Sequence, residues 1–114
     1  MLSYPAELKY LEAVDQTGQD FPITKLKYKG FAANNGGGTA VWIQIFFLPK
    51  SQVTLGTTKP DDRQLVPASG AARFLMEASH LVTPLGLSVY VTATETGNGA
   101  PAAPINVGIY YEGV

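Results

Sequence analysis

The chain has 114 residues, of which 46% are hydrophobic and only 15% are charged, with a net charge of −1 and no cysteine. This length suits one domain that buries roughly two-thirds of its unfolded surface. The charge balance argues against a nucleic-acid binder, and the lack of cysteine excludes disulfides, a thiol nucleophile and a zinc finger.

The charged share lies below the quarter or so that is usual for soluble domains. Two interpretations stay open: a surface covered by partner subunits, or a small all-β domain rich in Thr, Gly and Ala. Residues 1–5 lack the basic patch and apolar run of a signal peptide. No stretch approaches the length of a membrane span.

The first twenty residues are predicted to form an N-terminal arm or an edge strand. Residues 5–14 favour helix by composition but lack a convincing N-cap, and the polar cluster at residues 15–20 is typical of a turn. We expect this segment to reach a neighbouring subunit by strand addition, while residues 21–114 fold as the β-sandwich. Deletion of residues 1–20 should then abolish binding and leave the sandwich folded. The candidate contact residues are Leu2, Tyr4, Leu8 and Tyr10.

Residues 21–33 are predicted to form a long strand with one solvent-exposed face. Lys25, Lys27 and Lys29 occupy alternate positions, which places their side chains on the same side of a pleat. These lysines are candidate contacts for an acidic partner. The favoured interpretation is a solvated face on which lysine discourages edge pairing.

Residues 40–48 are the most hydrophobic strand candidate, bounded by the Asn/Gly-rich residues 34–38 and by Pro49. One face of the pleat is wholly apolar and the other holds Trp42, Gln44 and Phe46. This pattern predicts the central strand of a sheet. Its apolar face is expected in the core, and its second face is expected to be covered by another part of the structure.

The rest of the chain predicts a series of short strands and loops. Strands are expected at residues 63–67, 71–76, 87–95 and 105–111, with at most a short strand in the crossover at residues 49–60. In the strand at 87–95 the odd-numbered residues are expected to point inward and the even-numbered ones outward, and in the last strand residues 105, 107, 109 and 111 share one apolar face. Residues 81–86 are predicted to be a loop or bulge. The loop at residues 97–104 carries two further candidate contacts, Asn98 and Pro101. Six to eight strands without a clear helix predict an all-β, antiparallel β-sandwich of jelly-roll-like type.

The polar residues form no recognisable catalytic, cofactor-binding or metal-binding motif in the sequence. His80, the single histidine, is interpreted as a structural loop residue, because the chain has no cysteine and no serine in a nucleophile elbow. Asp61 and Asp62 are interpreted as a polar turn, since adjacent residues of an extended chain point to opposite sides. The protein is therefore predicted not to be an enzyme and to use no cofactor; a small hydrolase is the least favoured hypothesis.

The aromatic residues offer one further possibility, a sugar-stacking surface, because an aromatic ring presents an apolar plane. Packing in the core and between sheets is the favoured interpretation. The residues concerned are Trp42, Tyr10, Tyr28, Tyr90, Tyr110 and Tyr111.

The order of segments over residues 30–111 resembles that of small tailed-bacteriophage virion proteins. In those proteins an aromatic-ended strand precedes a Leu-Gly-Thr-Thr-x-Pro segment, a Pro-Ala-x-Gly turn, a Gly-Leu-Ser strand, a Gly/Ala/Pro-rich loop and a terminal aromatic strand. The matching segments here are 41–47, Leu55–Pro60, Pro67–Gly70, Gly86–Ser88, 97–104 and 109–111. The chain departs from that pattern at Phe47-Leu48, where those proteins have an acidic residue.

This resemblance implies a β-sandwich structural protein of the virion, made in the host cytoplasm. The expected function is that of a capsid decoration (cement) protein, which self-associates as a homo-oligomer and binds the major capsid protein or other virion subunits. The alternative is a receptor- or glycan-binding module of a tail or fibre, in which Trp42 or Tyr90 would contact the sugar. Neither nucleic acid nor membrane is an expected partner.

Overall fold

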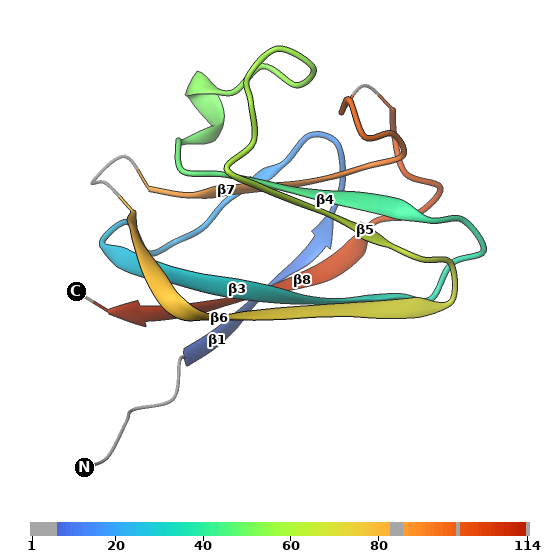
Figure 1. Cartoon of the computed structure of the whole chain (residues 1–114). Helices are drawn as coiled ribbons and strands as arrows, with labels where there is room; N and C mark the ends of the chain where they lie inside the picture. The colour runs from blue at the N-terminus through green and yellow to red at the C-terminus, as the bar shows by residue number, and fades with distance from the viewer. Residues whose placement is uncertain (1–6, 83–85, 98, 114) are drawn as a thin grey trace.

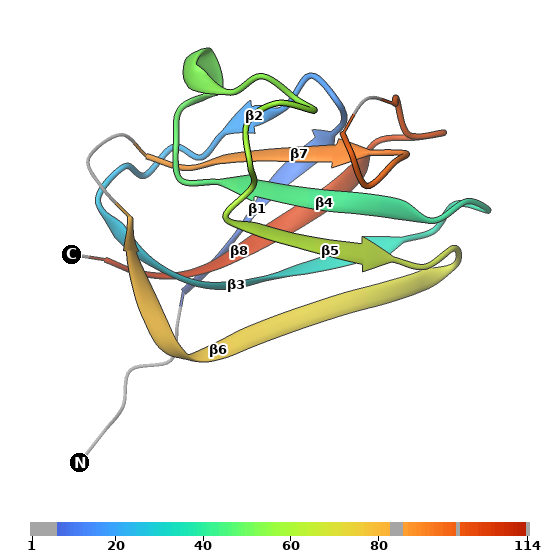
Figure 2. The ribbon, with the colours of Figure 1, turned by 45° about the horizontal axis from the view of Figure 1, so that its top comes forward.

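The computed structural model describes residues 7–82, 86–97 and 99–113, with the backbone alone for residues 74–82. Two four-stranded antiparallel sheets pack face to face (Figures 1 and 2). Sheet 1 has the order β1-β8-β3-β6 and sheet 2 has the order β2-β7-β4-β5. The predicted all-β, antiparallel β-sandwich is confirmed. The elements are β1 (Glu7–Val14), β2 (Gln19–Asp20), β3 (Leu26–Asn35), β4 (Val41–Phe46), the 3-10 helix η1 (Lys50–Gln52), β5 (Asp62–Val66), β6 (Gly70–Val82), β7 (Ser88–Thr92) and β8 (Ile105–Gly113).

Strand β4 is a central strand, as predicted, since it pairs with β5 on one side and β7 on the other. Val41, Ile43 and Ile45 point into the core between the sheets. They meet the alternate residues of β8, whose core face was also predicted correctly. Burial of apolar side chains from both sheets is the main stabilising contribution to a sandwich of this kind.

The second face of β4 is also buried, because loops cover the outside of sheet 2. The segments between β4 and β5 and between β7 and β8 lie over this face (Figure 1). Phe46 is fully buried and its ring meets that of Tyr90 edge-on, with centroids 5.4 Å apart. Gln44 is buried as well and donates a hydrogen bond of 2.9 Å to the Thr92 hydroxyl.

Strand β3 changes its core face at a β-bulge. Leu26 and Tyr28 point into the core, but beyond the bulge it is Phe31 and Ala33 that do so. The bulge lies between Tyr28 and Gly30, and Gly30 has a φ of 129°, which side chains rarely tolerate. The predicted strand therefore begins later and ends later than expected, and Phe21 to Lys25 precede it.

The N-terminal segment is an edge strand of the sandwich over residues 7–14 rather than a free arm. Strand β1 pairs with β8, and Leu11 and Val14 belong to the core. A division of the chain at residue 20 therefore does not separate an arm from the sandwich. Deletion of residues 1–20 would remove Leu11 and Val14 from the core, so we no longer expect the sandwich to remain folded without them.

Residues 53–60 hold turns and no strand, in keeping with the expectation of at most a short strand, and their backbone bonds are local, such as that from Thr58 N to the Thr54 carbonyl. Two further segments differ from the sequence-based expectation. Strand β6 runs to Val82, so His80 lies on a strand, opposite Tyr28, and not in a loop. Residues 88, 90 and 92 point away from the core as expected, but loops bury them.

Candidate binding surfaces

One end of sheet 1, which we call the terminal end, gathers Glu7, Leu8, Lys27, Lys29 and Glu112. Glu7 is paired with Tyr111 and Leu26 with Gly113, so the first and last described residues lie at this end. Leu8 is 41% exposed although it is a large apolar side chain. Strand β1 lies at the margin of the sheet, with β8 as its one sheet partner among the described residues. Its outer edge therefore presents unpaired backbone groups.

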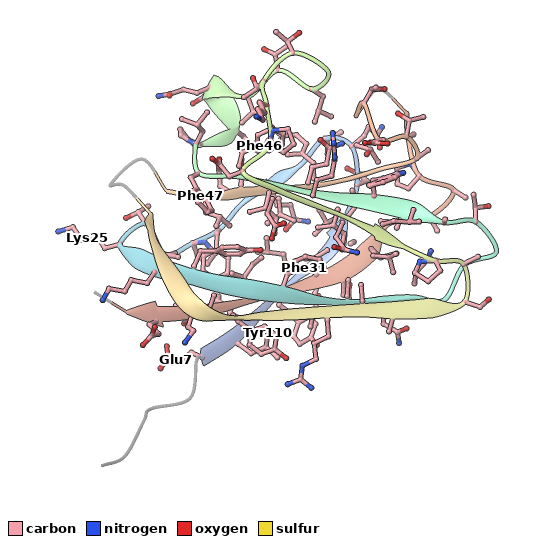
Figure 3. The ribbon with its side chains drawn as sticks, in the orientation of Figure 1. Glu7, Lys25, Phe31, Phe46, Phe47 and Tyr110 are labelled. Carbon is pink, nitrogen blue, oxygen red and sulfur yellow. The ribbon has the colours of Figure 1, made fainter. Side chains whose placement is uncertain are left out.

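The lysines predicted as partner contacts lie at this end too. Lys25 and Lys27 are exposed, and Lys25 precedes β3 instead of belonging to it (Figure 3). Lys29 is half-buried and forms an ion pair of 3.7 Å with Glu112. Within the described residues Lys25 and Lys27 have no ion pair, so their positive charge remains open to a partner.

The outer face of sheet 1 has no loop cover in the described part of the chain, in contrast to sheet 2 (Figure 3). Leu8 and Tyr10 project from β1 over Gly108 of β8, where any Cβ would come within 2.8 Å of Leu8 Cδ1. Tyr110 lies beside them, and the Arg73 guanidinium lies 5.3 Å from its ring centre. This uncovered face is therefore partly apolar and aromatic.

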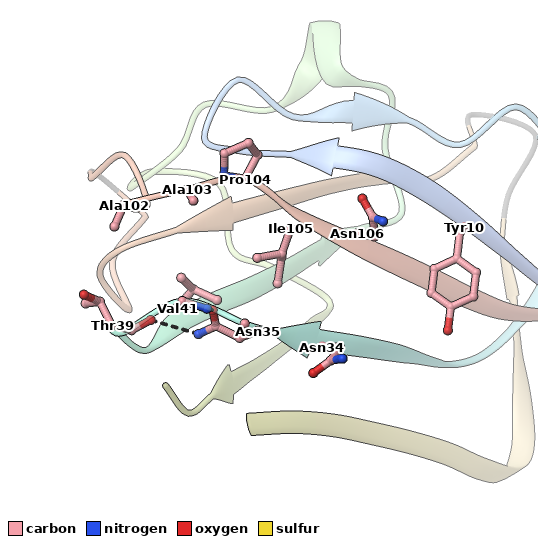
Figure 4. Close-up of a pocket in the computed structure, with 12 residues that line it drawn as sticks. Tyr10, Asn34, Asn35, Thr39, Val41, Ala102, Ala103, Pro104, Ile105 and Asn106 are labelled. Atoms are coloured by element: carbon pink, nitrogen blue, oxygen red, sulfur yellow. Dashed lines mark hydrogen bonds between the residues drawn. The ribbon is translucent and has the colours of Figure 1, made fainter. Parts of the chain in front are cut away.

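A groove of about 540 Å³ lies at the opposite end of sheet 1 (Figure 4). Strands β1, β3 and β8 supply Tyr10, Asn34 and Asn106, and the β3–β4 loop supplies Thr39. Tyr10 is 52% exposed, the largest exposed fraction among the large hydrophobic side chains described. Residues 102–104 close the far side. The groove was not predicted from the sequence, because it depends on how three strands align.

Asn35 fixes the loop at the groove. Its side chain is buried, donates a hydrogen bond of 2.8 Å to the Thr39 carbonyl and accepts one of 3.0 Å from Gly37 N. A buried carboxamide with both ends bonded holds the backbone in one conformation. The dashed bond in Figure 4 is the one between Asn35 and Thr39.

Asn106 links strands β8 and β1 at the opposite wall of the groove. Its Oδ1 accepts a hydrogen bond of 3.0 Å from Ala13 N. Ala13 has a φ of 52°, in the left-handed region, within a stretch where the β1–β8 register shifts. Bulges of this kind are common beside binding sites, where they re-aim the side chains around them.

The aromatic residues other than Tyr10 do not form a sugar-stacking surface. Tyr28 and Tyr111 are buried in the core, which confirms the packing interpretation for these two. Tyr90 is buried under the loops outside sheet 2, and Tyr110 is buried on the outer face of sheet 1. Burial and the neighbouring Asp62 carboxylate raise the pKa of Tyr28 above its usual range. Trp42 is half-buried, and the Arg63 guanidinium lies 5.8 Å from its ring centre.

The adjacent carboxylates have structural partners. Asp61 Oδ2 accepts a hydrogen bond from Phe47 N, and Asp62 Oδ2 accepts one from the Tyr28 hydroxyl, both of 2.7 Å. The two side chains therefore bind different elements and do not face one another as an acid–base pair would. Among the described residues no three His, Cys, Asp or Glu side chains lie close enough to hold a metal ion.

Of the remaining predicted contact residues, Pro101 is half-buried in the loop before β8. Leu2, Tyr4 and Asn98 lie outside the described residues. Of the predicted contact residues, Leu8 and the lysines thus lie at the terminal end and Tyr10 lines the groove, although Leu8 and Tyr10 are neighbours over Gly108.

Within the described residues no helix is long and apolar enough to cross a membrane. Comparison with known proteins adds no relative: no family model, curated protein or solved structure matches the chain.

Proposed function

We propose that this protein is a non-enzymatic structural component of a phage virion, a capsid decoration (cement) protein that attaches to the assembled coat through its terminal end. The observation that carries the proposal is the unpaired edge of β1 beside the exposed Leu8. An open strand edge is a site at which another chain can pair, and Leu8 adds apolar contact area beside it. The resemblance of residues 30–111 to virion proteins supports the same function.

We further infer that the sandwich is of the jelly-roll type. In each sheet, strands from the first half of the chain alternate with strands from the second half. Strand β8 lies between β1 and β3, and β7 lies between β2 and β4. An eight-stranded double sheet of this kind occurs in viral capsid and lectin domains. Since a fold hosts many functions, this order supports a virion protein without choosing its position on the particle.

The proposed mechanism is attachment that depends on the assembled lattice. Strand β1 would extend a sheet of a coat subunit, while Leu8 and the open lysines contact that subunit or its neighbour. An interface of ordinary size buries about 800 Å² on each partner. If part of that area comes from two adjacent coat subunits, the protein binds the assembled lattice only and stabilises it by mass action. Self-association of the protein on the lattice would add to the same effect.

The test is sedimentation of purified particles with and without the protein, combined with thermal release of the packaged genome. The proposal expects co-sedimentation in hundreds of copies, as a lattice of repeated subunits requires, and a higher release temperature. A handful of copies without a thermal effect would contradict it and would favour a tail or fibre component. Removal of residues 1–6 alone, which spares β1, should weaken the attachment.

A further inference from the structure

The groove at the far end of sheet 1 has a lining suited to a neutral polar ligand. None of the twelve residues that line it is charged. Its volume, about 540 Å³, falls inside the range of small-molecule sites. The absence of Lys and Arg from this lining argues against a phosphate or carboxylate ligand, which such sites bind through charge-assisted hydrogen bonds.

The hydrogen-bonding groups of the groove come from Asn34, Asn106 and Thr39. Because Ala13 N already bonds to Asn106 Oδ1, the Nδ2 group of Asn106 keeps two N–H donors for a ligand. The carboxamide of Asn34 and the hydroxyl of Thr39 form no side-chain hydrogen bond within the described residues, and both side chains are exposed. The site therefore offers both donors and acceptors at its rim.

The aromatic part of the groove lining is the ring of Tyr10, and Val41, Ile105 and residues 102–104 add further apolar surface. Tyr10 Cε1 would lie 2.9 Å from a Cβ at position 108, so the ring fits against the sheet because residue 108 is glycine. About half of the side chain stays open to solvent. An exposed ring fixed in this way presents an apolar plane beside the carboxamides.

We propose that this groove binds a neutral pyranose sugar, with the Tyr10 ring against the apolar C–H face of the sugar and with Asn34 and Asn106 hydrogen-bonded to its hydroxyls. A sugar combines one apolar face with a rim of hydroxyl donors and acceptors, which matches this lining. A peptide is the competing ligand, but a peptide site favours deep apolar pockets for side chains or an open strand edge.

The groove is preorganised for such a ligand. Asn35 holds the β3–β4 loop, and the bond between Ala13 and Asn106 sets the direction of the Asn106 donors. Preorganisation matters for sugars, because a weak ligand cannot offset the ordering of flexible side chains. Tyr10 and Leu8 are neighbours on β1 and both lie over Gly108, but Asn34 and Asn106 lie away from the lysines of the terminal end, so variants of these two asparagines test sugar binding separately from attachment to a capsid.

The experiment is titration of the isotope-labelled full chain with methyl glycosides of glucose, galactose, mannose and their N-acetyl-hexosamines, followed by amide NMR. We expect at least one glycoside to shift the amides of residues 34–39 and 102–106 and to leave those of the terminal end unchanged. No shift with any glycoside, or shifts centred elsewhere, would overturn the proposal. Shifts of the groove amides by a neutral peptide alone would assign the groove to peptide recognition and overturn it too.

Two pairs of variants make the test specific. Asn106→Asp keeps an acceptor for Ala13 N but removes the donors, and it should weaken binding about fivefold. The matched control is Gln64→Glu, the same chemical change at an exposed position of β5 on the other sheet, which should leave binding unchanged. Tyr10→Ala should weaken binding about fivefold, whereas Tyr10→Phe retains the ring and should bind nearly as well. Equal affinity of wild type and Tyr10→Ala would contradict the proposal.

Discussion

The Tyr28 hydroxyl on β3 donates a hydrogen bond of 2.7 Å to the Asp62 carboxylate on β5 and so joins the two sheets through their side chains. Tyr28 is almost fully buried, and its ring also meets that of Phe47 edge-on, with centroids 5.4 Å apart. The hydroxyl thus reaches a carboxylate at the rim of the core, where the partner keeps some contact with water.

Removal of this hydroxyl should lower the stability of the sandwich. Hydrogen bonds to charged groups are worth about 2 kcal/mol, so Tyr28→Phe should reduce the free energy of unfolding in urea by about that amount. Tyr10→Phe removes a hydroxyl from an exposed tyrosine and serves as the control, with little change expected. An unchanged urea midpoint for Tyr28→Phe would show that the inter-sheet bond adds no net stability.

Tyr28 should also make stability depend on alkaline pH. Its folded pKa is raised above the unfolded value of about 10, so its contribution is fully present below pH 10 and is lost as the pH rises beyond it. Tyr90 and Tyr111 also have raised pKa values, chiefly through burial, and act in the same direction. Urea unfolding between pH 9 and about 12 should show a steeper loss for wild type than for Tyr28→Phe. Parallel curves would contradict the assignment.

The bulge in β3 depends on Gly30. Its φ of 129° is strained for any residue with a Cβ, so Gly30→Ala should lower the free energy of unfolding by about 1–3 kcal/mol. Gly38→Ala is the matched control, because a Cβ there meets nothing within 4 Å. Thermal unfolding of the two variants measures the difference, and equal midpoints would show that the bulge tolerates a side chain.

Gln44 and Thr92, the buried polar pair under the loops of sheet 2, should make strongly coupled contributions to the free energy of unfolding. Gln44 Nε2 donates to Thr92 Oγ1, which donates in turn to the Thr94 carbonyl at 2.8 Å. Thr92→Val leaves the Gln44 amide buried without its acceptor, at a cost of about 2 kcal/mol. The double variant Gln44→Leu/Thr92→Val should cost less than the sum of the single variants. Additive losses in a double-mutant cycle would show that the pair is not coupled.

The terminal end can be tested with two leucines of nearly equal exposure. Leu8 on sheet 1 is 41% exposed and Leu65 on sheet 2 is 40% exposed. If the terminal end attaches the protein to the capsid, Leu8→Asp should reduce the number of bound copies several-fold, whereas Leu65→Asp should bind like wild type. Circular dichroism checks that both variants fold. Equal loss in both, or none in either, would place the attachment elsewhere.

The core faces of β4 and β8 could be predicted because alternation in sequence is alternation in space when a strand is regular. The same reasoning failed in β3, since Lys29 and Gly30 continue the alternating pattern of the sequence while the backbone forms a bulge between Tyr28 and Gly30. It also gave the wrong surroundings for Tyr90. A residue that points away from the core is expected to be exposed to solvent. Tyr90 is buried instead, because loops that are distant in the sequence cover it in the folded structure.

The groove could not be predicted for a different reason. Tyr10, Asn34 and Asn106 are far apart in the chain, and each alone is an ordinary strand or turn residue. Their proximity follows from the pairing of Tyr10 with Gly108 and of Ala32 with the same residue. Such registers arise from the packing of a whole sheet, which is not visible in a local pattern.

The place of β8 in sheet 1 has a consequence for synthesis of the chain. Strand β8 is the one sheet partner of β1 among the described residues and a second partner of β3, which also pairs with β6, so sheet 1 is complete only after residues 105–113 have been synthesised. Long-range pairing of this sort makes folding slow and leaves edges open in the meantime. Until β8 has been synthesised, the apolar residues of β1 therefore lack their partner strand, and an interruption of translation within residues 105–113 would leave sheet 1 incomplete.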